Sequence, residues 1–165
     1  MYFSRLIALV NIDANASIWY LATMNDPNLT TQAAWAALMI KSRTLLESVE
    51  ADLKSAGHPS LSWYDALLEL ERVGEDGLRP FELRDRLLLP QYGTSRLLER
   101  MVKAGLVQRR NCEEDGRGQI IAITDQGRAV RSEMWPIYAK ALSDGLEVKL
   151  SANEITQLTT LLSKL

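Results

Sequence analysis

Residues 79–127, RPFELRDRLLLPQYGTSRLLERMVKAGLVQRRNCEEDGRGQIIAITDQG, contain the pattern that decides the fold. Pro80 favours a short helix over 79–88, because a proline in the first turn removes no helical hydrogen bond. Leu89 and Pro90 end that helix, and 91–104 predicts a second helix that stops at Gly105. A short helix, a turn and a second helix in this order predict a helix-turn-helix.

The periodicity changes directly after this second helix. Residues 106–110 (LVQRR) and 119–123 (QIIAI) predict two strands, and 113–118 (EEDGRG) is rich in residues that form turns. We therefore expect a two-stranded hairpin immediately behind the helix-turn-helix.

Helical patterns flank this unit on both sides. Residues 30–56 carry apolar side chains at helical spacing, and Ser62 with Asp65 resembles a capping-box pair for a helix over 61–73. Behind the hairpin, Thr124 is expected to cap a helix that runs to about residue 143, and Ser151 with Glu154 is expected to cap a last one. The predicted fold class is mainly α with a small β-hairpin.

Charge is distributed unevenly along the 165 residues, whose net charge is −2. Residues 1–78 carry 5 basic and 10 acidic side chains, residues 79–117 carry 9 and 6, and residues 118–165 carry 5 and 5. The positive segment thus coincides with the helix-turn-helix and the hairpin, as expected of a surface that faces a polyanion. A solvated charged surface is the alternative explanation.

Candidate DNA contacts lie at the start of the second helix, which in a helix-turn-helix meets base edges in the major groove. Gln91 is suited to adenine, Arg96 to guanine or a phosphate, and Arg100 projects from the same face one turn later. An ordinary surface helix is the alternative. The full candidate set on this helix is Gln91, Tyr92, Gly93, Thr94, Ser95, Arg96 and Arg100.

The hairpin turn supplies a second candidate contact. Arg117 stands between two glycines, and an arginine on a slim hairpin can enter the minor groove, where negative potential is concentrated. Asp115 is placed to orient its guanidinium through a charge-assisted hydrogen bond. A plain polar turn is the alternative.

Residues 61–130 resemble the MarR family of bacterial regulators, and the resemblance extends over about 29–165. Its most specific parts are 95–100 (SRLLER) followed by 105–107 (GLV), and Asp115-x-Arg117 followed by 123–127 (ITDQG). Pro90 departs from the pattern, since many members open the recognition helix with serine or a similar polar residue, so the operator preference is not carried over.

The resemblance implies a winged helix-turn-helix domain plus N- and C-terminal dimerisation helices, joined in a triangular homodimer on a pseudo-palindromic DNA duplex. The family domain then covers 24–165, with a DNA-binding core at about 61–127 and dimerisation helices at about 29–56 and 128–165. Residues 91–100 become the recognition helix, with Asp115 and Arg117 at the wing. The expected function is that of a ligand-responsive repressor.

The resemblance also implies a small aromatic or anionic effector, bound between the dimerisation helices and the DNA-binding core. Trp35, Trp63 and Tyr64 are the residues expected there, with plain core packing as the alternative. Cys112, the only cysteine, lies in the wing, whereas peroxide-sensing relatives carry theirs in the N-terminal helical region. A redox role for Cys112 is therefore the less favoured interpretation.

Other classes of function fit the sequence less well. One histidine and one cysteine are too few for a protein-built zinc site, and no nucleophile–base pair or phosphate-binding glycine loop indicates an enzyme or a cofactor. A winged-helix protein-interaction module without DNA binding is the alternative function. It predicts acidic or apolar residues at the groove-facing positions, and this sequence does not have them there.

The first 23 residues are interpreted as an N-terminal extension that need not be native, with Met24 as an alternative start. The apolar run over 6–10 is shorter than the core of a signal peptide, about 7–15 residues, and far below the ~20 residues that span a bilayer. A single cysteine also fits a reducing compartment. We therefore expect a cytoplasmic protein without a membrane segment.

Overall fold

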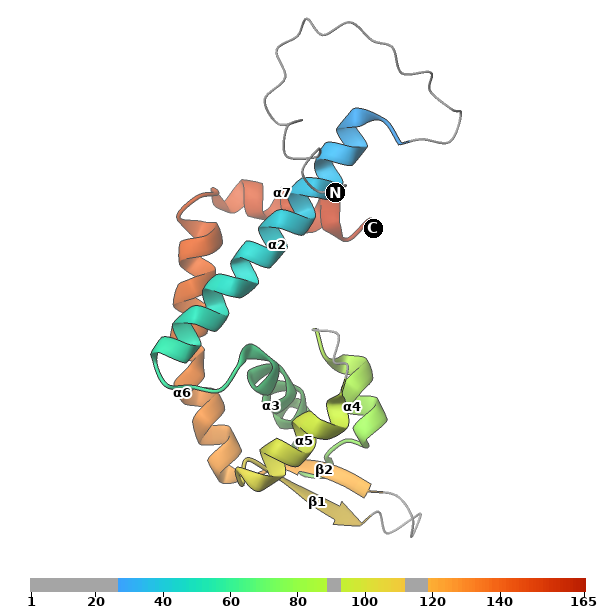
Figure 1. Ribbon diagram of the computed structural model, residues 1–165, viewed down its shortest axis with the longest axis vertical. Coiled ribbons are helices and arrows are strands. Elements are labelled where there is room, and N and C mark those ends of the chain that lie inside the picture. The colour runs from blue at the N-terminus through green and yellow to red at the C-terminus, as the bar shows by residue number, and fades with distance from the viewer. Residues whose placement is uncertain (1–26, 89–92, 112–118) are drawn as a thin grey trace, which may run out of the picture. The chain divides into compact units, whose positions relative to one another are not determined.

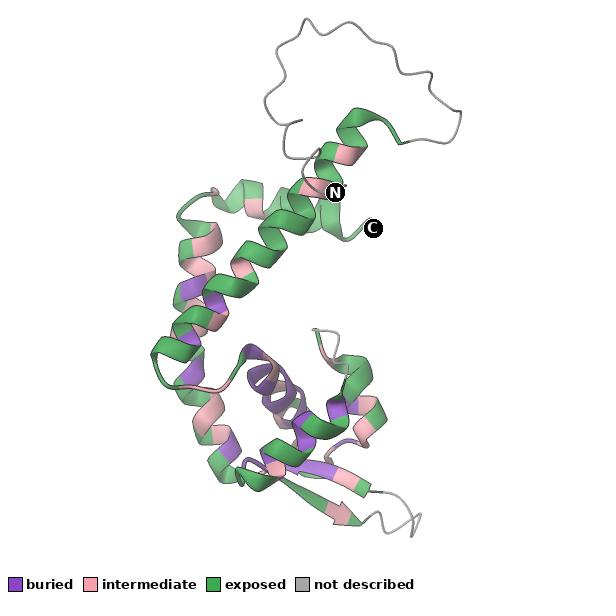
Figure 2. Cartoon of the chain, viewed as in Figure 1, coloured by how far each residue is buried: buried purple, intermediate pink, exposed green. Residues whose placement is uncertain are grey.

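The computed structural model describes residues 27–88, 93–111 and 119–165. Contacts divide the chain into two units, residues 1–46 and residues 47–165. The described part of the first unit consists mainly of the N-terminal portion of helix α2 (Leu29–Ser55), and this helix continues into the second unit. Most of its side chains are exposed, as Figure 2 shows, and its two buried residues, Val49 and Leu53, lie near its C-terminal end.

The second unit contains the remaining elements (Figure 1), and the predicted fold class is confirmed. Two helices, α4 and α5, stand between α3 and a two-stranded hairpin, and further helices follow the hairpin. The elements after α2 are α3 (Leu61–Val73), the 3-10 turn η2 (Gly74–Asp76), α4 (Pro80–Arg86), α5 (Thr94–Lys103), β1 (Val107–Asn111), β2 (Gln119–Ile123), α6 (Asp125–Leu142), the π-helical turn η3 (Ser143–Glu147) and α7 (Ala152–Leu162).

One hydrophobic core holds α3, α4, α5 and the hairpin together. It buries side chains from every one of these elements, which explains why two short helices and two short strands form a stable unit. Its buried members are Trp63, Ala66, Leu67, Leu70, Leu78, Leu83, Leu97, Leu98, Met101, Leu106, Val107, Ile121 and Ile123.

A second cluster joins α3 to α6 and to the C-terminal part of α2. Its buried members are Val49, Leu53, Leu61, Tyr64, Met134 and Ala141. Because α3 contributes to both clusters, its residues are buried on almost all sides. The expected Ser62–Asp65 cap is wrong: Ser60 precedes the helix, and Asp65 lies inside it with its carboxylate used elsewhere.

The hairpin is antiparallel, with Val107 paired to Ile123 and Asn111 to Gln119. A third chain segment lies beside β2, where Leu78 and Ile121 exchange two backbone hydrogen bonds of 2.9 and 2.8 Å. Gly77 permits this close approach, because a Cβ there would lie 2.5 Å from the carbonyl oxygen of Ile121. The hairpin is thereby fixed to the segment that links α3 to α4.

Thr124 joins the end of α5, the hairpin and the start of α6. Its hydroxyl donates to the Gly105 carbonyl at 2.7 Å and accepts the Gly127 N–H at 3.1 Å, so the predicted cap is confirmed. The Thr124 N–H donates to the Leu106 carbonyl at 3.1 Å. A Cβ on Gly127 would lie only 2.1 Å from the Leu106 carbonyl oxygen, so α6 begins in tight contact with the α5–β1 connection.

Helix α7 begins with the predicted capping box, in which Ser151 and Glu154 exchange side-chain and backbone hydrogen bonds. None of its residues is buried, and its exposed leucines fall at helical spacing on one face: Leu158, Leu161 and Leu162, with Leu165 just beyond the helix. Among the described helices, none combines the length and the apolar character that crossing a membrane requires.

Candidate nucleic-acid interface

Helix α5 has one face in the core and one face in solvent. Thr94, Leu97, Leu98 and Met101 are buried. The exposed side chains on the other face are Ser95, Arg96, Glu99, Arg100 and Lys103. A predominantly cationic and polar face on the second helix of a helix-turn-helix has the chemistry needed to bind phosphates and base edges.

The predicted contact residues divide into three groups in the structure. Ser95, Arg96 and Arg100 are exposed on α5 as expected. Thr94 is buried, because it opens the helix on its core side. Apart from Gly93, the other candidates lie outside the described residues, as does Cys112: they are Gln91, Tyr92, Asp115 and Arg117.

Gly93 precedes α5 with a φ of +108°, in the region that side-chain-bearing residues rarely adopt. Among the residues that the structure describes, none lies within 4 Å of the position that a Cβ would occupy. The need for glycine here is therefore conformational.

The connection before α5 is anchored by a buried carboxylate. Asp65, in the middle of α3, accepts the backbone N–H of Leu88 through Oδ2 at 2.8 Å. A charge-assisted bond of this kind is strong, and Asp65 has little access to water. Asp65 thus fixes the chain where it leaves α4, a function that the sequence did not reveal because a long-range bond leaves no local pattern.

Arg100 lies over the indole of Trp63, with its guanidinium carbon 5.4 Å from the ring centroid. Cation–π contacts of this geometry hold a guanidinium in place without neutralising its charge. Trp63 is 8% exposed and belongs to the core of the helix-turn-helix. The structure therefore places one predicted effector residue against a predicted DNA-contact residue.

Tyr64, the next residue along α3, belongs to the second cluster. It stacks on Trp135 with a centroid separation of 6.3 Å and meets the edge of Tyr138 at 5.2 Å. Burial, together with repulsion from Tyr64 and Asp65, raises the pKa of Tyr138 above its ordinary value of 10.0. Trp135 is 47% exposed, so this aromatic cluster reaches the surface.

The three predicted effector residues have different surroundings, each described within its own unit. Trp63 and Tyr64 belong to different clusters, and Trp35 is 62% exposed in the first unit. A pocket of about 290 Å³ instead lies between the end of α2 and the start of α3. It is lined by Glu50, Ala51, Lys54, His58, Pro59 and Ser60.

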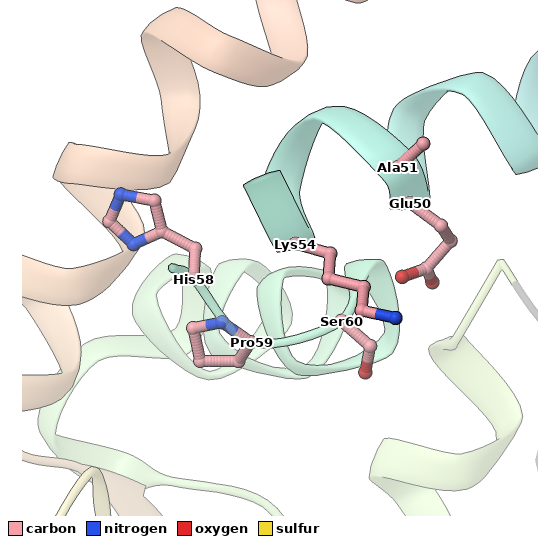
Figure 3. Close-up of a pocket in the computed structure, with 6 residues that line it drawn as sticks. All are labelled: Glu50, Ala51, Lys54, His58, Pro59 and Ser60. Carbon is pink, nitrogen blue, oxygen red and sulfur yellow. The ribbon is translucent and has the colours of Figure 1, made fainter. Parts of the chain in front are cut away.

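Figure 3 shows that the charged ends of Glu50 and Lys54 extend to one side of this pocket, whereas the His58 ring points to the other. Glu50 is already engaged, because its Oε1 accepts the Leu61 N–H at 3.0 Å and so supports the start of α3. Within the described ranges, no three histidine, cysteine or acidic side chains gather in a way that could hold a metal ion.

On the wing, Arg109 is an exposed cation that the sequence analysis did not single out. It lies on β1, and its Nη1 donates to Oε1 of Gln119 across the hairpin at 3.1 Å. Strand alternation was the available signal, because it places the neighbouring arginines Arg109 and Arg110 on opposite faces.

Residues 59–118 match the model of the MarR family. This segment includes α3, α4, α5 and the first strand of the hairpin. Over this segment the chain is similar to the MarR family.

Solved structures extend the similarity beyond residues 59–118. AbsC, a MarR family transcriptional regulator from Streptomyces coelicolor, is 26% identical, with 84% of this chain and 93% of that chain covered and a TM-score of 0.72. Sco3205 from the same organism, a MarR family transcriptional regulator solved in complex with DNA, is 22% identical, with 84% and 90% covered and a TM-score of 0.76.

The organohalide-sensing regulator RdhR-CbdbA1625, solved with 2,4-dichlorophenol bound, is 17% identical, with 88% of this chain and 87% of that chain covered and a TM-score of 0.70. At this identity the likeness concerns the fold. A comparison with curated proteins gave no match.

Proposed function

We propose that this chain is a DNA-binding transcription regulator that inserts α5 into the major groove of a duplex operator. The observation that carries the proposal is the division of α5 into a buried apolar face and an exposed face with Ser95, Arg96 and Arg100. The match of residues 59–118 to the MarR family model supports the same function, as does the DNA-bound structure of Sco3205, which shares the fold.

Within this proposal, Arg96 and Ser95 contact bases or phosphates. Arg100, whose guanidinium lies over the Trp63 ring, contacts the DNA backbone. Thr94 supports the helix from the core side and is not a proposed contact. Gln91, Tyr92, Asp115 and Arg117 stay predictions from the sequence.

A homodimer is the proposed assembly. The leucine face of α7 is exposed on a helix that buries none of its own residues, and covering such a face requires a partner. A second copy also places two α5 helices on one duplex, at a separation near 34 Å, about one helical turn. The division into a core at about 61–127 and dimerisation helices at about 29–56 and 128–165 belongs to this proposal.

The finer proposal is an effector-responsive repressor in the bacterial cytoplasm, where its operator is located. A small aromatic or anionic effector regulates DNA binding only through different affinities for the two states of the dimer. RdhR-CbdbA1625, with its bound chlorophenol, is a precedent among proteins of this fold. The partly exposed Tyr64–Trp135–Tyr138 cluster offers the aromatic chemistry for such a ligand.

Selection of bound duplexes from a random DNA pool tests the proposal. We expect enrichment of a pseudo-palindrome whose half-sites are centred about 10 base pairs apart. Arg96→Met should then lower affinity for that duplex about tenfold or more, whereas Lys149→Met, an equal loss of charge outside the helix-turn-helix, should not. A pool without enrichment would favour the protein-interaction module instead.

A further inference from the structure

The neighbouring arginines of β1 occupy different environments although the sequence presents them as one basic pair. Arg109 is exposed and spans the hairpin surface to Gln119. Arg110 is half-buried on the other face, and its Nη2 donates to the backbone carbonyl of Glu75 in the η2 turn. The same charge is therefore available to solvent in one case and engaged with the main chain in the other.

The face of the hairpin that carries Arg110 lies directly on the η2 region. Ile120 is paired with Arg110, and a Cβ on Gly77 would lie 2.6 Å from Cγ2 of Ile120. The Nε of Arg110 is buried and finds no hydrogen-bond partner among the residues described. Moving this guanidinium out to a phosphate would break its bond to the Glu75 carbonyl.

The turn that holds Arg110 is also tied to α6. The carboxylate of Glu75 pairs with Nη2 of Arg128 at 3.0 Å, one turn into α6. A second ion pair joins Glu71 of α3 to Arg131. Glu75 thus offers its main chain to the wing and its side chain to α6.

We propose that Arg110 is a positioning residue that sets the angle of the wing through the Glu75 carbonyl, while Arg109 provides the cation that faces DNA. Glu75 connects the same turn to α6, so the wing and α6 share one support. The DNA part of this inference rests on the proposed function, whereas the part that concerns the wing holds for the free protein.

The salt dependence of DNA affinity separates the two arginines. Each phosphate contact contributes about 0.9 to the slope of log affinity against log salt. Because a homodimer carries each substitution twice, Arg109→Met should reduce the slope by about 2. Arg110→Met should weaken binding about tenfold at every salt concentration with the slope unchanged. Methionine is chosen because it keeps the apolar stem of arginine.

Amide hydrogen exchange of the free protein provides the second measurement and does not depend on DNA binding. We expect Arg110→Met to accelerate exchange in β1 and β2 several-fold, and Arg109→Met, which removes only an exposed side-chain bond to Gln119, to accelerate it much less. Accelerated exchange without any DNA binding by the parent protein would reject the proposed function and keep the role of Arg110 in the wing.

A third measurement uses the unsubstituted protein and so does not depend on whether the variants fold. The guanidinium N–H protons of Arg110 should exchange slowly with water, and operator DNA should not change their chemical shifts. The chemical shifts of the Arg109 guanidinium should change when DNA binds. An Arg110 signal that shifts with DNA, or an Arg110→Met slope reduced as much as that of Arg109→Met, would overturn the proposal. Unchanged exchange in Arg110→Met would overturn it as well.

Discussion

At the scale of single residues, several side chains of this chain serve the fold in ways that their type alone does not reveal. Asp65 fixes the chain at Leu88. Trp63 holds the Arg100 guanidinium over its ring, and Arg110 donates to the Glu75 carbonyl. Each of these contacts joins residues of different elements. Reading the local sequence cannot find them, because nothing in the neighbouring residues records a partner far along the chain.

Tyr138 should make the folded state sensitive to high pH. Its pKa is raised in the folded chain by burial and by its neighbours Tyr64 and Asp65. Its contribution is complete below the ordinary pKa of 10.0 and is lost as pH rises through the higher folded value, because the unfolded chain ionises first. Denaturant titrations at about pH 8 and about pH 11 should show a smaller loss of stability for Tyr138→Phe than for the parent. An equal loss in both would contradict this.

Gly93→Ala should destabilise the protein through backbone conformation alone. The φ of +108° is unfavourable for alanine, at a cost of roughly 1–2 kcal/mol, and no atom of the described residues obstructs the added methyl group. Urea titration should give a loss of stability in this range. A neutral substitution would show that the turn before α5 adjusts freely.

At the scale of elements, the hairpin depends on its contact with the segment between α3 and α4. Gly74 and Gly77 offer a matched pair for measuring this dependence, since their φ values are +66° and +67°. Within the described part of the chain, no atom lies within 4 Å of a Cβ at Gly74, whereas at Gly77 the Cβ would meet the Ile121 carbonyl oxygen at 2.5 Å.

Gly77→Ala should therefore cost about 1–3 kcal/mol more than Gly74→Ala, because only the former adds a steric overlap to the shared conformational strain. Denaturant titration of both variants measures the difference. Equal losses would show that the hairpin yields without cost at its contact with Gly77.

The elements were largely predictable from sequence, because their signals are local. Proline at the first turn of α4, glycine after α5 and the Ser151–Glu154 pair each mark a boundary within a few residues. The Ser62–Asp65 cap was wrong because an acidic residue three positions after a serine also suits a buried role. The separation of Trp63 from Tyr64 followed from α3 packing on both sides, which no periodicity in one helix specifies.

At the scale of the whole molecule, the leucine face of α7 predicts dissociation of the proposed dimer on substitution. Leu158→Asp combined with Leu162→Asp places charges on that face, where burial against a partner is costly. Light scattering at micromolar concentration should report a dimer for the parent and a monomer for this variant. Thr160→Asp, on the opposite side of α7, should leave the dimer intact.

Thr124 has a consequence for how motion can pass through the second unit. With one residue bonded both to the end of α5 and to the first turn of α6, and with Gly127 pressed against Leu106, no slack is left between strand and helix. A tilt of α6 should therefore move β2 with it. A bend in α6 that leaves the hairpin in place has to lie farther along the helix. A residue inserted between 123 and 127 should uncouple the motion of α6 from that of β2.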